Sequence, residues 1–349
     1  MTNIKSLTPE QISEQLTALN LPRYRTEQII RWLYGRGVSG FHEMSDLPLP
    51  LRSELAERYA LHAPQLAEKQ TSDDGTVKYL WRLNDGNAVE SVLLRYDYGN
   101  SICVSTQAGC KMGCTFCASP PHGFSRNLSF AEILDQILFA QRDSGLQISR
   151  VDLMGIGEPL DNFDNVLSFL KLVNDPLFAP GGRAKGSPLG LNIGMRHISI
   201  STCGPPGGIE RLMRCRLQCN LLVSLHAPDD ATRSRLMPIN RAEGVDKLLA
   251  DCKRYSVETG RRVSFEYALI KGVNDSDAQA ESLAEKIKAV GGHINIIRLN
   301  EASPQYSAGD VHAFCKKLIT LGANATVRRT LGADISAACG QLRVRGNIF

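Results

Sequence analysis

The chain has 349 residues, 43% of them hydrophobic, and a formal net charge of +4. A chain of this length is expected to bury a sizeable core in one large α/β unit, with or without a smaller unit beside it. Because no apolar run approaches the roughly 18 residues of a membrane helix, and the start lacks the apolar stretch of a secretory signal, we expect a cytoplasmic protein that does not bind a membrane.

Residues 1–65 are predicted to form a small helical domain. Thr8 and Gln11 can form a capping box at the start of a first helix. Amphipathic patterns then predict two more helices, over residues 24–37 and 51–60. The pattern is that of a separable helical module.

Residues 66–100 are predicted to form a β-hairpin extension. The β-rich runs 76–83 and 88–96 flank the sequence Asn-Asp-Gly-Asn at 84–87. An Asp-Gly pair between two such runs is typical of a tight hairpin turn.

From residue 101 the pattern changes to alternating strands and helices, and we assign 101–323 to this unit and 324–349 to a C-terminal segment. Repeated strand–helix units predict a parallel sheet with crossover helices. Periodicity does not choose between an open doubly wound sheet and a partial barrel, but in both the chemistry belongs at the C-terminal ends of the strands. A long loop rich in Gly and Pro, 175–194, departs from the alternation.

Three of the ten cysteines, Cys110, Cys114 and Cys117, lie in a C-x3-C-x2-C spacing. In a chain without a secretory signal, clustered thiols more often bind metal than form disulfides. A structural zinc site needs a fourth ligand, and the nearest candidates, Cys103 and His122, fit no common zinc pattern. A four-iron cluster normally takes four thiolates, so three would leave one iron open to a small molecule.

The C-x3-C-x2-C loop, with an aromatic residue before its last cysteine, resembles the radical S-adenosylmethionine (SAM) enzymes. The resemblance implies a [4Fe-4S] cluster held by the three cysteines, with SAM on the open iron. It also implies that Gly157 and Glu158, in "MGIGEPL", contact the amino group of SAM; a dinucleotide fingerprint is disfavoured because position 160 is Leu rather than a third Gly. The other implied SAM contacts, at predicted strand ends, are Ser201, Ser224, Leu225, His226 and Asn300.

Several motifs in order, "GCKMGCTFCAS", "GIGEPLDN", "SLHAPDDATRSRLMPIN" and "GADISAACGQL", together with the early "YRTEQIIRWLY", resemble the RlmN-type RNA methyltransferases over nearly the whole chain. The fold implied is a partial (β/α)6 barrel related to the TIM barrel, with a small N-terminal helical domain and a β-hairpin extension. The function implied is methylation of adenine carbon 2 in 23S rRNA, at the peptidyl-transferase centre, and in tRNA, at adenine 37 beside the anticodon. The partners implied are these RNAs, with residues 1–65 as a candidate RNA contact, and an electron donor such as flavodoxin or ferredoxin; we expect a monomer.

The same resemblance implies roles for three further residues and two SAM molecules per turnover. One SAM methylates Cys339, and the second yields a radical that takes a hydrogen atom from the S-methyl group. The carbon then adds to the RNA as a protein–RNA crosslink, Glu90 removes a proton, and Cys103 releases the product by forming a transient disulfide with Cys339. Without the resemblance, Cys103 and Cys339 read as structural thiols and Glu90 as an exposed strand carboxylate.

Other interpretations stay open at this point. The nearest is a Cfr-type enzyme, which methylates carbon 8 of the same ribosomal adenine with the same cysteines. An iron–sulfur electron carrier would need a fourth cluster cysteine, and an RNA-binding module without chemistry would not explain the cysteine loop. The C-terminal arginines are expected either to contact phosphates or to lie in a solvated terminus; they are Arg328, Arg329, Arg343 and Arg345. The cysteines expected to be structural are Cys203, Cys215, Cys219, Cys252 and Cys315.

Overall fold

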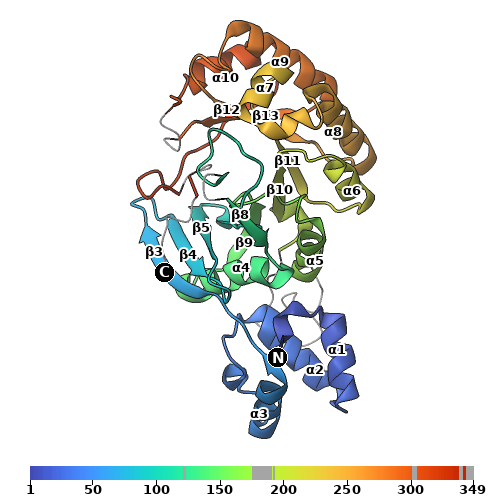
Figure 1. Cartoon of the computed structure of the whole chain (residues 1–349). Helices are drawn as coiled ribbons and strands as arrows, with labels where there is room; N and C mark the ends of the chain where they lie inside the picture. Colours follow the sequence, from blue (N-terminus) through green and yellow to red (C-terminus); the bar gives the residue numbers. More distant parts are fainter. Residues whose placement is uncertain (121–122, 175–190, 192, 301–304, 338–340, 343–349) are drawn as a thin grey trace.

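The computed structural model describes residues 1–120, 123–174, 191, 193–300, 305–337 and 341–342. Within them, ten strands form one sheet in the order β14-β13-β12-β11-β10-β9-β6-β5-β4-β3. Figure 1 shows the N-terminal helices at one end of the molecule, next to α4, and the sheet with its covering helices above them. The predicted loop 175–194 falls mostly outside the described residues.

The N-terminal module consists of α1 (Pro9–Ala18), α2 (Arg23–Gly35) and α3 (Leu49–Arg58), with the short strands β1 (Thr2–Asn3) and β2 (Tyr59–Ala60) paired in parallel. The predicted capping box is confirmed: the Thr8 side chain accepts from the Gln11 amide, and the Gln11 side chain accepts from the Thr8 amide. The module is fixed to the rest of the chain by a buried ion pair between Lys5 and Asp135 of α4. Single 3₁₀ turns occur at Ile4–Ser6, Phe41–Glu43, Met195–His197 and Pro238–Arg241.

The antiparallel part of the sheet contains β3 (Gln65–Thr71), β4 (Val77–Arg82) and β5 (Ala88–Tyr96). The predicted hairpin is therefore confirmed as β4–β5, while β3 was not predicted. Strand β5 also pairs with β6 (Gly99–Cys103), the first barrel strand. The hairpin thus continues the barrel sheet at one edge.

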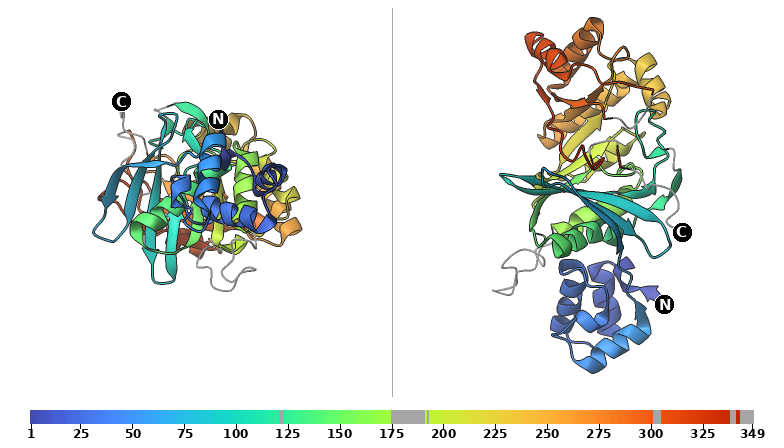
Figure 2. Two further views of the ribbon diagram at one scale, coloured as in Figure 1. Left: turned by 90° about the horizontal axis from the view of Figure 1, so that it is seen from below. Right: turned by 90° about the vertical axis from the view of Figure 1, so that its left-hand side faces the viewer.

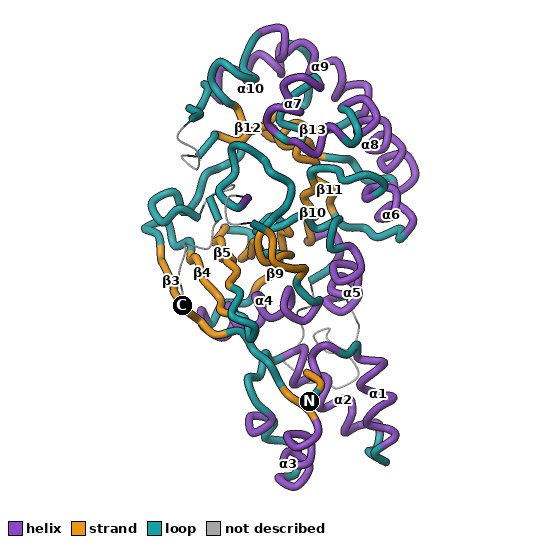
Figure 3. The backbone as a smooth tube through the Cα atoms, in the orientation of Figure 1, coloured by secondary structure: helices purple, strands orange, loops and turns teal. Residues whose placement is uncertain are grey.

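The parallel strands follow one another in the sheet in chain order. Figure 3 shows strands in orange and helices in purple. A doubly wound sheet reverses its strand order at a switch point, so the sequential order identifies the partial barrel. After β6 the strands are β9 (Ile148–Leu153), β10 (Ile198–Thr202), β11 (Asn220–Ser224), β12 (Ser264–Leu269), β13 (His293–Arg298) and β14 (Ala325–Val327). The helices between them are α4 (Phe130–Ser144), α5 (Phe163–Val173), α6 (Gly208–Arg214), α7 (Asp230–Leu236), α8 (Val245–Thr259), α9 (Asp277–Val290) and α10 (Val311–Thr320).

The main core lies between the outer face of the sheet and these helices, on the side that Figure 2 shows covered by helices. Ile102, Val151, Ile200, Leu221 and Phe265 point to this face, and each is at most 1% exposed. Because successive side chains of a strand alternate between faces, the residues between them point to the inner face. Polar side chains therefore collect inside the barrel.

The cysteine loop lies between the first barrel strand, β6, and helix α4. It connects β7 (Gln107–Gly109) to β8 (Phe124–Asn127), a small antiparallel hairpin in which Ala108 pairs with Arg126. Both strands are too short to show a periodic pattern, which explains why the sequence did not indicate them. The hairpin carries the cysteines over the C-terminal ends of the barrel strands.

Candidate active site

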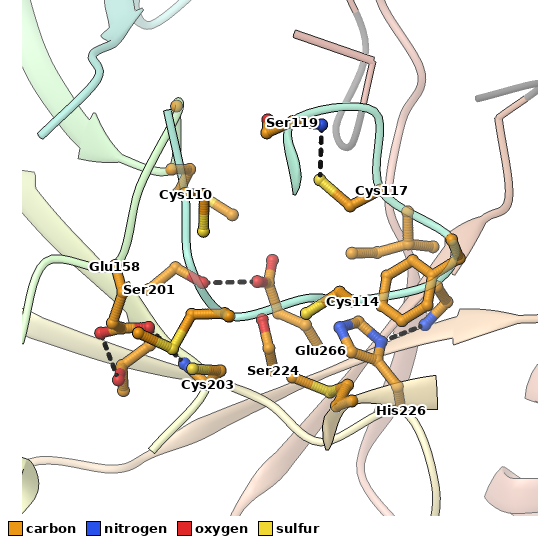
Figure 4. A pocket seen from close by; sticks show the side chains of 18 of the residues that line it. Cys110, Cys114, Cys117, Ser119, Glu158, Ser201, Cys203, Ser224, His226 and Glu266 are labelled. Carbon is orange, nitrogen blue, oxygen red and sulfur yellow. Dashed lines mark hydrogen bonds between the residues drawn. The ribbon is translucent and has the colours of Figure 1, made fainter. Parts of the chain in front are cut away.

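A pocket of about 160 Å³ lies at the C-terminal ends of the barrel strands. The cysteines of the β7–β8 loop form one wall, and residues from β10, β11 and β12 form another (Figure 4). The predicted site residues that line it are Cys110, Cys114, Cys117, Gly157, Glu158, Ser201, Ser224, His226 and Asn300. Residues that lie up to 190 positions apart in the chain therefore share one cavity.

The three thiols are suited to binding metal as a group. Burial raises the pKa of Cys110 to about 11 and the pKa of Cys114 further, and the neighbouring thiols raise both. Thiolates in such a place need a positive charge beside them, which iron would supply. Among the described residues, no three Cys, His, Asp or Glu side chains share a single ion position, which is compatible with ligands to separate irons of one cluster.

Glu158 lies behind the cysteines and is held by three donors. It is 3% exposed, and its carboxylate accepts from the Leu160 amide (2.9 Å), the Thr202 hydroxyl (2.7 Å) and the Cys203 amide (2.8 Å). Burial raises its pKa. An ionised carboxylate has about four acceptor positions, so these bonds leave room for an ammonium group of a ligand.

Gly157 is required by the backbone at this point. Its φ is +106°, and a Cβ would lie 2.5 Å from Cβ of Gln107 in β7. The Gln107 side chain in turn accepts from the Glu158 amide at 2.8 Å. The glycine thus lets the Glu158 turn approach the cysteine hairpin closely.

Glu266 is a pocket residue that the sequence analysis missed. It is 3% exposed, and its carboxylate accepts from the Ser201 hydroxyl and from Arg328, both at 2.8 Å. A single carboxylate in the apolar run of β12 was a signal that could have found it. The ion pair also corrects the expectation for Arg328, which lies inside the barrel rather than in a solvated terminus.

His226 is neutral in this site. It is 5% exposed, its Nδ1 accepts from the Ala268 amide at 2.9 Å, and burial together with the nearby Arg233 lowers its pKa to about 3. The proton of the neutral ring is therefore on Nε2. The ring packs edge-on against Phe116 of the cysteine loop, with centroids 4.8 Å apart.

Arg233, also missed, fixes the ends of two barrel strands. Its guanidinium is 1% exposed and donates to the carbonyls of Leu225, Ser224 and Cys203 at 2.8–3.0 Å. The Leu225 side chain is fully buried in the main core, so only its backbone is available to a ligand. Cys203, which was expected to be structural, is buried in an apolar cluster and also lines the pocket.

Cys103 and Glu90 lie beside this pocket. Cys103 lines a cavity that shares Met154, Ile297 and Asn300 with the first pocket. Glu90, 6% exposed, lines a further cavity with residues of β3 and β4.

The strand register places both residues on one face of the sheet. Cys103 pairs with Val92, which is two residues from Glu90 on β5, and side chains two residues apart on a strand point the same way. Asp152 of β9 pairs with Cys103 from the other side. The inner face of the barrel therefore continues without interruption from the first pocket to Glu90.

Cys339 lies outside the described residues, and so do Arg343 and Arg345. On either side of 338–340, Ala337 and Leu342 pack in one apolar cluster with Val92 and Ile156. The Leu342 carbonyl also accepts from the Ser119 hydroxyl, at the end of the cysteine loop, at 2.8 Å. The described parts of the C-terminal segment thus contact both the cysteine loop and the β5 strand.

Two families of known proteins match parts of this chain. Residues 104–284 match the family described as the radical SAM superfamily, and residues 2–61 match the ribosomal RNA large subunit methyltransferase N-terminal domain. The chain is 48% identical over 347 residues to a protein of Pelotomaculum thermopropionicum named probable dual-specificity RNA methyltransferase RlmN, a match that covers 98% of this chain and 91% of the relative. The chain belongs to the RlmN family of radical SAM enzymes.

Other similar proteins agree with this RlmN membership. A protein of the same name from Desulforamulus reducens is 45% identical over 348 residues, covering 98% of this chain and 96% of the relative. The crystal structure of a radical SAM methyltransferase from Sphaerobacter thermophilus is 40% identical, covers 98% of this chain and 99% of that chain, and superposes with a TM-score of 0.89. Membership of the radical SAM superfamily implies a [4Fe-4S] cluster and SAM as cofactors. In the described part of the chain, no helix is long and apolar enough to cross a membrane.

Proposed function

We propose that this RlmN-family enzyme methylates carbon 2 of adenine in 23S rRNA, at the peptidyl-transferase centre, and in tRNA, at adenine 37. The names of its relatives and the N-terminal family match support RNA as the substrate. The observation that carries the proposal is the continuous inner face that joins the cysteine pocket to Cys103 and Glu90. The proposed covalent RNA intermediate gives both residues a role in the reaction.

Three cysteines of the pocket would hold the cluster, and other pocket residues would contact SAM. Cys110, Cys114 and Cys117 would bind three irons of the [4Fe-4S] cluster and leave the fourth to SAM. When bound, the cluster and SAM supply a radical able to abstract a hydrogen atom. Around SAM we propose Gly157, Glu158, Ser201, Ser224, the Leu225 backbone, His226 and Asn300.

Carbon 2 of adenine is not nucleophilic, so the chain must deliver the carbon by another route than direct methyl-cation transfer. We propose that Cys339 carries the carbon as an S-methyl group and that a thioether then joins it to the RNA. Glu90 takes the proton from carbon 2. The Cys103 thiolate attacks the Cys339 sulfur and forms the disulfide, the electron pair of the broken sulfur–carbon bond goes to the carbon, and that carbon takes up a proton to become the methyl group of the released RNA.

Each turnover would consume two SAM molecules, one as methyl donor and one for hydrogen abstraction. An electron donor such as flavodoxin or ferredoxin would be needed, and we propose a monomer that acts in the cytoplasm, where its RNA substrates are. Residues 1–65 would contact the RNA, and residues 324–349, whose first strand β14 still belongs to the sheet, would carry the methyl acceptor. A target adenine in folded RNA would have to be extruded from its stack to reach the barrel.

The test is product analysis. The cluster is reconstituted anaerobically, SAM, reductant and unmodified RNA are added, and the digested nucleosides are compared with 2-methyladenosine and 8-methyladenosine by mass spectrometry. We expect 2-methyladenosine from the wild type and none from Cys339→Ala. A product of 8-methyladenosine would instead indicate the Cfr-type reaction, and no product with SAM still cleaved would refute the proposed substrate.

A further inference from the structure

Lys78 of β4 lies between Glu90 and the C-terminal segment. Its Nζ is 3.8 Å from a Glu90 oxygen, and the two side chains are 12% and 7% exposed. The same Nζ donates to the Ser336 carbonyl at 3.4 Å. One buried ammonium group therefore contacts both the proposed base and the backbone three residues before Cys339.

The strand register explains how these groups meet. Lys78 pairs with Val92 of β5, and Leu80 pairs with Glu90, so Lys78 and Glu90 are diagonal neighbours on one face of the sheet. Val92 also pairs with Cys103 on its other side. Lys78 is thus placed by backbone hydrogen bonding on the same face as both proposed reactive residues.

Among the described residues, Lys78 is the cation that forms an ion pair with Glu90; Arg82, a further basic residue of β4 on this face, pairs with Ala88 and is exposed. From β3, Glu68 lines the same cavity, and one carboxylate beside another disfavours the ionised form of both. From the described part of the C-terminal segment, Ser336 and Gln341 line it and carry no charge. Lys78 is the single cation among the described residues that line this cavity. Its charge favours the ionised form of Glu90, which burial and the nearby Glu68 disfavour.

We propose that Lys78 is a positioning residue for the methyl transfer, which keeps Glu90 ionised and holds the Ser336 backbone beside it. The inference rests on the proposed function, since it requires Glu90 to act as the base. In that step the proton leaves carbon 2 and bonds to a Glu90 oxygen, giving a neutral carboxylic acid, while Lys78 keeps all its protons. An ionised carboxylate next to the RNA adduct is the form that can accept this proton.

Removing the charge should change the pH dependence of adduct resolution. Without Lys78, Glu90 keeps its proton to higher pH, so the fraction of active base falls at low pH and recovers at high pH. A role limited to the Ser336 contact would instead lower the rate equally at every pH. The pH profile of Lys78→Gln separates the two roles, because the loss of the charge acts mainly at low pH whereas the loss of the Ser336 contact acts at every pH.

The experiment measures decay of the protein–RNA adduct on denaturing gels, in single turnover from pH 6 to pH 9, for the reconstituted full-length enzyme. We expect Lys78→Gln and Lys78→Met to displace the acid limb by about one pH unit, so that they resolve the adduct more slowly than the wild type at pH 6, by at most about tenfold, and at nearly the wild-type rate at pH 9. Lys78→Arg should restore the wild-type profile. The matched control is Lys69→Met, which removes a lysine of β3 that faces away and pairs with Asp143 at 2.6 Å; it should change nothing.

Two results would overturn the inference: an unchanged profile in Lys78→Gln, or a rate lowered equally at all pH values. Iron content and circular dichroism identify any variant that fails to fold. If Lys78→Met does not fold, Lys78→Gln is used for the test. If the proposed function itself is wrong, the wild type will form neither the adduct nor methylated adenosine. That result is distinct from both results that would overturn the role of Lys78.

Discussion

Replacing Lys5 with methionine is expected to destabilise the contact between the N-terminal module and α4. Lys5 is 0% exposed and Asp135 is 2% exposed, and they form a buried ion pair. Removing one partner of such a pair leaves the other charge buried and typically costs about 3–5 kcal/mol. For a chain of this size the melting temperature should fall by at least about 5 °C.

The loss should depend on pH in a defined direction. Burial raises the pKa of Asp135 to about 6, although Lys5 opposes the shift. A carboxyl whose pKa is raised on folding stabilises the folded state fully below its unfolded pKa, near 4, and that contribution is lost as the pH rises through the folded pKa. Without Lys5 the pKa of Asp135 rises further, so Lys5→Met should be more defective at pH 8 than at pH 5.

Thermal unfolding of the wild type, Lys5→Met and Lys5→Met/Asp135→Leu at both pH values tests the argument. The double variant should recover most of the lost stability, because an apolar pair of similar volume replaces a buried ion pair at little cost. Lys286→Met, which breaks a surface pair with Asp246, should cost at most about 1 kcal/mol. A Lys5→Met deficit that is equal at pH 5 and pH 8 would refute the account.

Four further predictions concern the site. Cys114→Ala should abolish bound iron and its visible absorption while circular dichroism stays unchanged; retention of iron would contradict the ligand assignment. Cys103→Ala should accumulate a covalent protein–RNA adduct on denaturing gels, and free methylated RNA from this variant would exclude its proposed role. Glu266→Gln removes the charge that pairs with Arg328 and should weaken SAM binding by about tenfold, or about 1.4 kcal/mol, in equilibrium titrations; unchanged affinity would refute this. Arg233→Met leaves three buried carbonyls without their donor and should lower stability by about 3 kcal/mol in urea unfolding, whereas an unchanged midpoint would show that other donors replace it.

Regular elements of this chain were predictable because their signals are local. The Ser129/Glu132 capping box starts α4, and the alternating apolar runs became barrel strands. The β7–β8 hairpin was missed because its strands have only three and four residues. The order of the strands, which separates the barrel from a doubly wound sheet, is a long-range property that periodicity does not contain.

In the candidate site, too, local sequence signals were predictable and long-range pairings were not. Cys110, Cys114 and Cys117 were recognised from their spacing alone. Glu266 and Arg328 were missed because they are 62 residues apart in the chain, Glu266 on β12 and Arg328 directly after β14. No local sequence pattern joins them. Likewise, that Cys103 and Glu90 lie on one face follows from the β5–β6 register, which a single sequence does not specify.

The antiparallel strands and the barrel share one hydrogen-bonded sheet, and this limits which parts of the enzyme are able to move. Neighbouring strands stay about 4.8 Å apart, so the separations between the SAM pocket, Cys103 and Glu90 are set by the backbone. The described part of the chain after β14 is attached to this sheet by side-chain contacts instead, among them the apolar packing of Ala337 and Leu342 and the hydrogen bond from the Gly332 amide to Asp74. Under the proposed function, SAM, Cys103 and Glu90 would therefore act from positions whose spacing the hydrogen bonds of a single sheet determine.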